Sequence, residues 1–160
     1  MGIAGQGASA QIWRGIHRET GHPVAVKIIR ESRASNPKFA PLFSREVRAT
    51  ARLSHPGVIR LYDYGRIPPE TAAYAEGRIK EDQPFLIMEW VGGGTLREQV
   101  GLDWNRTRAI LLSILDALSV AHAHDITHRD IKPDNILLAE RGPVVTDFGI
   151  ALANELDPVD

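Results

Sequence analysis

HRDIKPDN, residues His128–Asn135, is the stretch of sequence that decides the fold. It places Asp130, Lys132 and Asn135 within six positions, on a loop that the flanking sequence predicts between a helix and a β-hairpin. A carboxylate, a cation and an amide oxygen held this close together can act on one reacting group. The loop therefore predicts a catalytic site, and the sequence on either side indicates its kind.

The histidines around this loop allow a second interpretation, a metal site. His122, His124 and His128 lie close together in the sequence. No carboxylate triad accompanies them, and His122 falls on the apolar stripe of the helix predicted there. Because a histidine metal site needs a cluster of ligands, packing roles are favoured over metal binding.

A further acidic residue, Asp147, lies in TDFG, residues Thr146–Gly149. It follows a short apolar strand and precedes a glycine, so its carboxylate can project from an adaptable backbone toward the same pocket. The Asp-Phe-Gly triplet has little significance by itself, but its position after the loop of residues 128–135 supports a role at the same site.

The glycine-rich stretch GQGASAQI, residues 5–12, predicts a phosphate-binding loop. Gly5 and Gly7 allow backbone amides to approach phosphate oxygens closely. A dinucleotide-binding fold is the rival interpretation, but its glycines open a helix. Here residues 11–16 have the composition of a strand and a hairpin turn follows, which favours glycines between strands.

Lys27 ends an apolar strand, where an unpaired ammonium group is expensive to bury. Glu46, on the next predicted helix, is the candidate partner. An exposed strand lysine and a solvated helix glutamate are the alternatives.

The hydrophobic pattern predicts strands over residues 11–16, 23–30, 58–65 and 85–90, a helix over residues 42–53 and a loop insertion over residues 67–83. After the glycines at 92–94, Asp103 is placed to cap a long helix. The predicted apolar stripe of that helix consists of Ile110, Leu111, Ile114, Leu115, Leu118 and His122. Residues 135–138 and 144–146 predict a small hairpin.

The composition is that of a soluble globular domain. Of 160 residues, 43% are hydrophobic and 24% charged, and the formal net charge is −1. Charges of both signs are interspersed, without the basic stripe of a nucleic-acid-binding surface. No stretch approaches the ~18 apolar residues of a membrane span, and the lack of cysteine fits a reducing compartment. We therefore expect a cytoplasmic domain with no nucleic-acid partner and no membrane segment.

Taken in chain order, G-x-G-x-x-A-x-I, VAVK, a helical glutamate, HRDIKPDN and DFG resemble the signature set of the protein kinase family. The sequence is similar to bacterial-type, Hanks-like serine/threonine protein kinases over nearly its whole length. The resemblance implies an α+β, protein-kinase-like fold. A β-rich ATP-binding N-lobe with its C-helix and hinge would occupy residues 1–91, and an incomplete α-helical C-lobe would occupy residues 92–160.

The resemblance also implies catalytic roles. Lys27, paired with Glu46, would hold the α- and β-phosphates of ATP. Asp130 would accept the proton of the substrate hydroxyl. Lys132 would contact the transferring phosphate, which favours a protein substrate with serine or threonine over tyrosine.

The same resemblance implies the binding residues. Asn135 and Asp147 would carry Mg²⁺. The further residues implied to contact ATP are Gly5, Gly7, Ala10, Ile12, Ala25, Met88, Glu89, Val91 and Leu137.

Three features depart from the family pattern. Ala10 replaces the third glycine of the loop, and Thr50 stands where an apolar residue is usual. The sequence ends at Asp160, before the APE motif and the later helices. We therefore expect an exposed apolar stripe on the long helix, with poor solubility and non-specific self-association of the isolated chain. An ATP-binding remnant or regulatory module without transferase activity, and a fragment of a longer kinase gene, are the alternatives.

Overall fold

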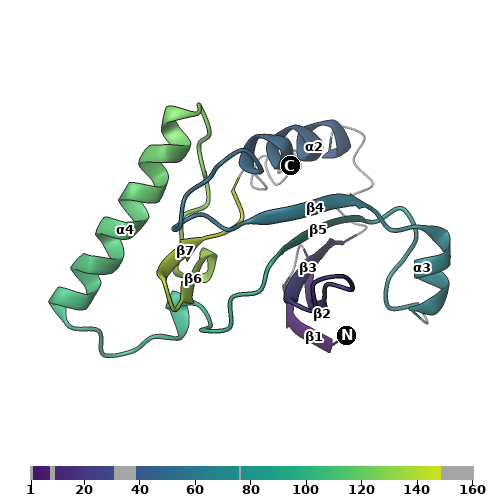
Figure 1. Ribbon diagram of the computed structural model, residues 1–160, viewed down its shortest axis with the longest axis horizontal. Coiled ribbons are helices and arrows are strands. Elements are labelled where there is room, and N and C mark those ends of the chain that lie inside the picture. The colour runs from purple at the N-terminus through teal and green to yellow at the C-terminus, as the bar shows by residue number, and fades with distance from the viewer. Residues whose placement is uncertain (1, 8–9, 31–38, 76, 149–160) are drawn as a thin grey trace, which may run out of the picture. The chain divides into compact units, whose positions relative to one another are not determined.

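The computed structural model describes residues 2–7, 10–30, 39–75 and 77–148 (Figure 1). Gly149 of the Asp-Phe-Gly motif and the predicted start of an activation segment, residues 150–160, lie outside the described residues. The chain forms two compact units, Met1–Pro41 with Leu61–Trp90 and Leu42–Arg60 with Val91–Asp160. The sequence-based division after residue 91 differs, since it assigns residues 42–60 to the first lobe, and it stays a prediction.

The first unit is built on a five-stranded antiparallel sheet in the order β1-β2-β3-β5-β4. Its strands are β1 (Gly2–Gln6), β2 (Ala10–Ile16), β3 (Pro23–Ile29), β4 (Leu61–Arg66) and β5 (Pro84–Glu89). The strands predicted near residues 11–16, 23–30 and 85–90 are confirmed, and β-branched residues fill β3 as expected. Gly5, expected in the glycine loop, lies within β1.

The predicted strand over residues 58–65 is wrong at its start, because β4 begins at Leu61. The backbone just before β4 bonds to another segment. Ile59 N donates to Val145 O at 2.9 Å, and Val145 N donates to Gly57 O at 2.8 Å. These hydrogen bonds commit residues 57–59 to the second unit.

Strand pairing gives the sheet two different faces, since directly opposed residues project to the same side. One face carries two rows of paired residues, Ile12–Lys27–Leu86 and Arg14–Ala25–Met88. The opposite face carries an apolar set, Trp13, Val26, Ile28 and Phe85. Ile12, Ala25, Lys27 and Met88 therefore share one face, whereas Glu89 pairs with Val24 and lies on the opposite face.

The insertion over residues 67–83 packs on the apolar face. Its Ile67, Ala72 and Ile79 side chains join the cluster around Trp13. The insertion is not the plain loop that was predicted. It contains the short helix α3 (Pro69–Tyr74), which starts at proline, a residue suited to the first helical turn, and which lies beyond the ends of β4 and β5 in Figure 1.

The two ends of the insertion are tied together. Ile67 N donates to Gln83 O at 2.9 Å, and Asp82 N donates to Ile67 O at 2.8 Å. Arg66 Nη1 also donates to the Asp82 carboxylate at 2.7 Å. The insertion therefore leaves and rejoins the sheet at one hydrogen-bonded base, formed by residues 66–67 and 82–83 and here called the closed neck.

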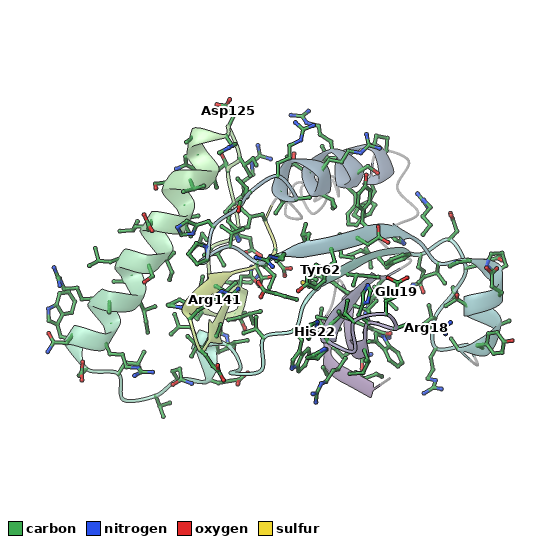
Figure 2. The ribbon with its side chains drawn as sticks, in the orientation of Figure 1. Arg18, Glu19, His22, Tyr62, Asp125 and Arg141 are labelled. Atoms are coloured by element: carbon green, nitrogen blue, oxygen red, sulfur yellow. The ribbon has the colours of Figure 1, made fainter. Side chains whose placement is uncertain are left out.

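The second unit is mainly helical. It contains most of α2 (Phe39–Thr50), α4 (Trp104–Ala123), the hairpin β6 (Ile136–Ala139) and β7 (Gly142–Val145), and the 3-10 helices η1 (Leu96–Glu98) and η2 (Pro133–Asn135). The predicted hairpin is confirmed. Figure 2 shows Arg141 at its turn, and Arg141 Nε donates to Pro56 O at 2.9 Å.

Helix α2 begins and ends three residues earlier than predicted. Leu53 follows the helix in a turn, where its N–H donates to Thr50 O at 3.0 Å. The departure at Thr50 is accommodated locally: the side chain is buried, and its hydroxyl donates to Glu46 O at 3.0 Å.

Asp103 caps α4 as predicted, since its side chain accepts a hydrogen bond from Arg106 N at 2.7 Å. The predicted stripe is only partly right. The buried residues of α4 are Ile110, Ile114, Ala117 and Ala121. Leu111, Leu115 and His122 are exposed, so the packing role predicted for His122 is wrong. The buried line has a spacing of three and four, and its last two members are small alanines that a search for large apolar residues overlooks.

Within the described residues, no helix is both long enough and apolar enough to cross a membrane.

Candidate active site

The predicted catalytic loop, residues 128–135 and here called the catalytic loop, brings Asp130, Lys132 and Asn135 together, as the sequence predicts. Lys132 Nζ donates to Asp130 Oδ2 at 2.7 Å. Asn135 Nδ2 donates to the same carboxylate oxygen at 3.0 Å and to Asp130 O at 2.8 Å. The loop turns sharply at Arg129, whose φ of 68° is uncommon for a residue with a side chain. One carboxylate thus receives hydrogen bonds from a cation and an amide.

These contacts set the ionisation of Asp130. Partial burial by itself would raise the pKa of this carboxyl, but the hydrogen bonds from Lys132 and Asn135 outweigh it and hold the pKa below its ordinary value. The side chain is still 34% exposed. Asp130 is therefore an ionised carboxylate at neutral pH, reachable from solvent and able to accept a hydrogen bond from a hydroxyl.

His128 supports the loop from inside. It is 1% exposed, and its Nδ1 accepts a hydrogen bond from Asp130 N at 3.1 Å. The proton of the neutral ring then resides on Nε2, which donates to Thr146 O at 2.8 Å. Burial lowers the pKa of His128. The packing role predicted for this histidine is confirmed, and the ring joins the catalytic loop to the strand that leads to Asp147.

Phe148 completes this support. Its ring meets His128 edge-on, with centroids 4.6 Å apart, and it belongs to the buried core of the second unit. That core consists of Leu53, Val58, Ile110, Ile114, Ala117, Ala121, Ile126, Ile136, Val145 and Phe148. The loop and the Asp-Phe segment are therefore fixed to the same core.

Asn135 and Asp147 lie at the same end of the β6–β7 hairpin. Thr146 N donates to Asn135 O at 2.9 Å, which continues the hairpin pairing by one step and places Asp147 next in the chain. Asp147 has a φ of 67°, which turns the chain at this point. Asn135 uses Nδ2 for both of its side-chain hydrogen bonds to Asp130, so these bonds do not involve its Oδ1.

The amide and carboxylate oxygens of these two residues fit a hard cation such as Mg²⁺, which prefers oxygen ligands and retains several waters. In the part of the chain that the structure describes, no group of three or more His, Cys, Asp and Glu side chains could hold a metal ion.

In the first unit, Lys27 is 6% exposed on β3, in one row with Ile12. The adjacent row contains Ala25 and Met88, both buried. A cation at the edge of small and apolar side chains is suited to a ligand with an apolar ring and an anionic tail.

The glycine turn closes between Gly7 N and Ala10 O at 3.0 Å. A Cβ added to Gly5 or Gly7 would have its nearest neighbour at 3.9 or 3.8 Å, an ordinary contact. Packing within the described residues therefore does not require glycine at these two positions. Ala10 is buried, with its backbone opposite Ile29.

The remaining predicted residues lie at the ends of elements or on the second unit. Glu89 ends β5 and Val91 follows shortly after it. Leu137 lies on β6, and Glu46 lies half-buried on α2, in the second unit. The pairing of Lys27 with Glu46 stays a prediction.

Sequence reasoning missed one pair beside the loop, Arg97 and Asp134. Arg97 Nε donates to Asp134 Oδ1 at 2.5 Å. This hydrogen bond and the opposite charge lower the pKa of Asp134 and raise the pKa of Arg97. The pair links η1 to η2 across 37 positions, and no local pattern in the sequence indicates such a contact.

The five-stranded sheet, the long capped helix and the catalytic loop define a protein-kinase-like α+β fold. Among solved structures, the kinase domain of Mycobacterium tuberculosis PknI is similar, with a TM-score of 0.77 and 26% identity. The match covers 94% of this chain and 57% of that one. The predicted fold class is confirmed.

Residues 1–158 match the family described as Protein kinase domain, and the chain belongs to that family. Serine/threonine-protein kinase PknA of Mycobacterium tuberculosis is 37% identical over 158 residues, 96% of this chain and 35% of that protein. Probable serine/threonine-protein kinase PknB of Bifidobacterium longum is 36% identical over 94% of this chain and 22% of that protein. The chain thus spans about a third or less of the length of these relatives.

Proposed function

We propose that this chain carries the ATP-binding and catalytic-loop portion of a serine/threonine protein kinase. The reaction is transfer of the terminal phosphoryl group of ATP to a serine or threonine hydroxyl of a protein. One observation carries the proposal: Asp130 is an ionised, accessible carboxylate, hydrogen-bonded by Lys132 and Asn135. The names of the relatives PknA and PknB support the same reaction.

In this reaction the substrate oxygen bonds to phosphorus, the bond from phosphorus to ADP breaks, and the hydroxyl proton passes to Asp130. The lowered pKa of Asp130 keeps it ready to accept that proton at neutral pH. Lys132, with Nζ 2.7 Å from Asp130 Oδ2, supplies positive charge next to the transferring group. The catalytic loop therefore orients the acceptor and stabilises charge, which is most of what phosphoryl transfer requires.

Nucleotide binding is proposed for the residues that the sequence predicts for it. Lys27, supported by Glu46, would hold the α- and β-phosphates. The other residues proposed to contact ATP are Gly5, Gly7, Ala10, Ile12, Ala25, Met88, Glu89, Val91 and Leu137. The shared face of Ile12, Ala25, Lys27 and Met88 supports this assignment.

Asn135 and Asp147 would hold Mg²⁺. When bound, this cation neutralises phosphate charge and orients the terminal phosphate. The chain's own part is to present two oxygen ligands from adjacent positions at the end of one hairpin.

Phosphate transfer from labelled ATP to a generic serine- and threonine-containing protein tests the proposal. Asp130→Asn is the matched variant, because it keeps the shape of the side chain and removes the charge. We expect very weak transfer by the parent chain and its loss in the variant. Equal signals from both proteins would exclude Asp130 as the proton acceptor.

A thermal-shift titration with Mg·ATP separates binding from transfer. Ligand at about 100 times its dissociation constant adds roughly 2.7 kcal/mol of stability. Stabilisation of the parent without any transfer would favour the alternative function, an ATP-binding module without transferase activity. No stabilisation and no transfer would overturn both.

The surface of α4 supports a proposal about self-association. Leu111, Leu112 and Leu115 are 49%, 51% and 61% exposed, and Trp104 is 70% exposed. Burying such side chains between molecules removes apolar surface from water, so we propose non-specific association of the isolated chain, measurable by sedimentation velocity.

A cytoplasmic location is proposed from the absence of cysteine.

A further inference from the structure

The short helix η2, which carries Asn135 at its end, lacks a cap of its own. Its N-cap residue is Lys132, and no side chain accepts a hydrogen bond there. A three-residue 3-10 helix is only weakly stable by itself. The position of Asn135 therefore depends on its hydrogen bonds to Asp130 and Thr146 and on contacts that hold the residues around it.

Such contacts come from the segment Gly93–Glu98, here called the clamp segment. Leu138 N donates to Gly94 O at 3.0 Å, and Thr95 forms an antiparallel bridge with Leu137. Arg97 Nε then bonds to Asp134 Oδ1 at 2.5 Å. The clamp segment thus contacts the chain on both sides of Asn135, by backbone at positions 137 and 138 and by side chain at position 134.

The clamp segment approaches the hairpin backbone very closely. A Cβ built on Gly93 would lie 1.9 Å from Leu138 O. Real Cβ atoms essentially never come within 3.0 Å of a heavy atom outside their own and the adjacent residues. Only glycine permits this approach, so the backbone contact is specific to the residue at position 93.

We propose that Arg97 is a positioning residue of the kinase reaction: by holding Asp134, it fixes η2 and thereby the orientation of Asn135 toward Asp130 and Mg²⁺. This inference rests on the proposed function for the role of Asn135. Arg97 itself does not touch substrate or metal in this scheme. Its effect passes through Asp134, the neighbour of Asn135, while the backbone contacts hold Leu137 and Leu138.

The charges of the pair suit this role at neutral pH. Arg97 is a cation and Asp134 an anion, and Nε of Arg97 lies within hydrogen-bond distance of Oδ1 of Asp134. Arg97 is 64% and Asp134 40% exposed, so the pair weakens as ionic strength rises.

Hydrogen exchange followed by mass spectrometry tests the clamp without any nucleotide. We expect Arg97→Gln to speed exchange of the amides of residues 134–138 by about two- to five-fold, the range typical of one exposed ion pair. Arg66→Gln is the matched control, since Arg66 also bonds to a carboxylate at 2.7 Å, that of Asp82 in the first unit. Exchange of residues 134–138 that is unchanged in Arg97→Gln, or equally changed in Arg66→Gln, overturns the proposal.

The dependence of Mg·ATP binding on Mg²⁺ concentration separates positioning from general stability. Arg97→Gln should raise the half-saturating Mg²⁺ concentration about two- to five-fold with an unchanged melting temperature, and Arg97→Lys should restore part of the difference. A lowered melting temperature with unchanged Mg²⁺ dependence would make Arg97 merely structural and overturn the inference. If the parent binds no Mg·ATP, the proposed function fails, and the proposed effect of Arg97 on Mg²⁺ binding fails with it. The hydrogen-exchange experiment then still tests whether Arg97 holds residues 134–138 in place.

Discussion

Replacing Gly93 with alanine tests the close backbone contact beside the catalytic loop. The added Cβ would lie 1.9 Å from Leu138 O. The backbones must therefore separate by roughly 1 Å to reach the 3.0 Å limit seen for real Cβ contacts. The hydrogen bond from Leu138 N to Gly94 O is 3.0 Å long, so that movement takes it out of range.

The magnitude follows from three effects. Forcing extra atoms into a packed contact costs about 1–3 kcal/mol, and the lost hydrogen bond costs about 0.5–1.5 kcal/mol. Alanine restricts the unfolded chain more than glycine does, which offsets about 0.4–1 kcal/mol. Taking the middle of each range, we expect Gly93→Ala to lower the free energy of unfolding by about 2 kcal/mol.

Urea denaturation followed by circular dichroism measures this difference, read from the midpoint at a constant m-value. Gly2→Ala is the matched control, because a Cβ built on Gly2 meets nothing within 4 Å. Its midpoint should stay close to that of the parent. A free energy of unfolding for Gly93→Ala within about 0.5 kcal/mol of the parent, the range of neutral surface substitutions, would refute the reasoning.

Three further predictions concern other parts of the chain. Burial lowers the pKa of His128 from 6.5, so the unfolded chain binds this proton more readily and the free energy of unfolding falls as the pH drops below 6.5. The urea midpoint of the parent should fall between pH 8 and pH 5, and that of His128→Asn should change less. Parallel curves for the two proteins would contradict this prediction. Arg14 lies over the ring of Trp90 at 5.3 Å, and a double-mutant cycle with Arg14→Met and Trp90→Leu should give a coupling of about 0.5–1 kcal/mol in thermal unfolding; additive effects would exclude the contact. Asp103→Ala should cost about 1 kcal/mol through loss of the cap that bonds Arg106 N, and an unchanged unfolding midpoint would show that the cap contributes nothing.

The catalytic loop could be predicted from sequence because its residues act locally. Asp130, Lys132 and Asn135 lie within six positions, so almost any loop that joins the helix to the hairpin brings them together. Strand β3 could be predicted for a similar reason, because its β-branched composition agrees with its burial. The fold class followed from the order of the motifs and is confirmed by the family match.

The errors arose where distant contacts decide the structure. Residues 57–59 have the composition of a strand, but their backbone hydrogen bonds go to Val145, which a local pattern cannot show. On α4 the buried line passes through Ala117 and Ala121, while larger residues such as Leu111 face outward. The contact of Arg97 with Asp134 joins residues 37 positions apart and is visible only in three dimensions.

The closed neck of the insertion has a consequence for engineering. Because Ile67 and Gln83 are bonded to each other, the register of β4 against β5 does not depend on how many residues lie between them. The entropic cost of lengthening such a loop rises only slowly, by about 0.6 kcal/mol for each doubling. The insertion at Tyr74, whose side chain is 87% exposed, is therefore a favourable position for inserting a reporter domain or an affinity tag. We expect such an insertion to leave the sheet intact, including β3 with Lys27.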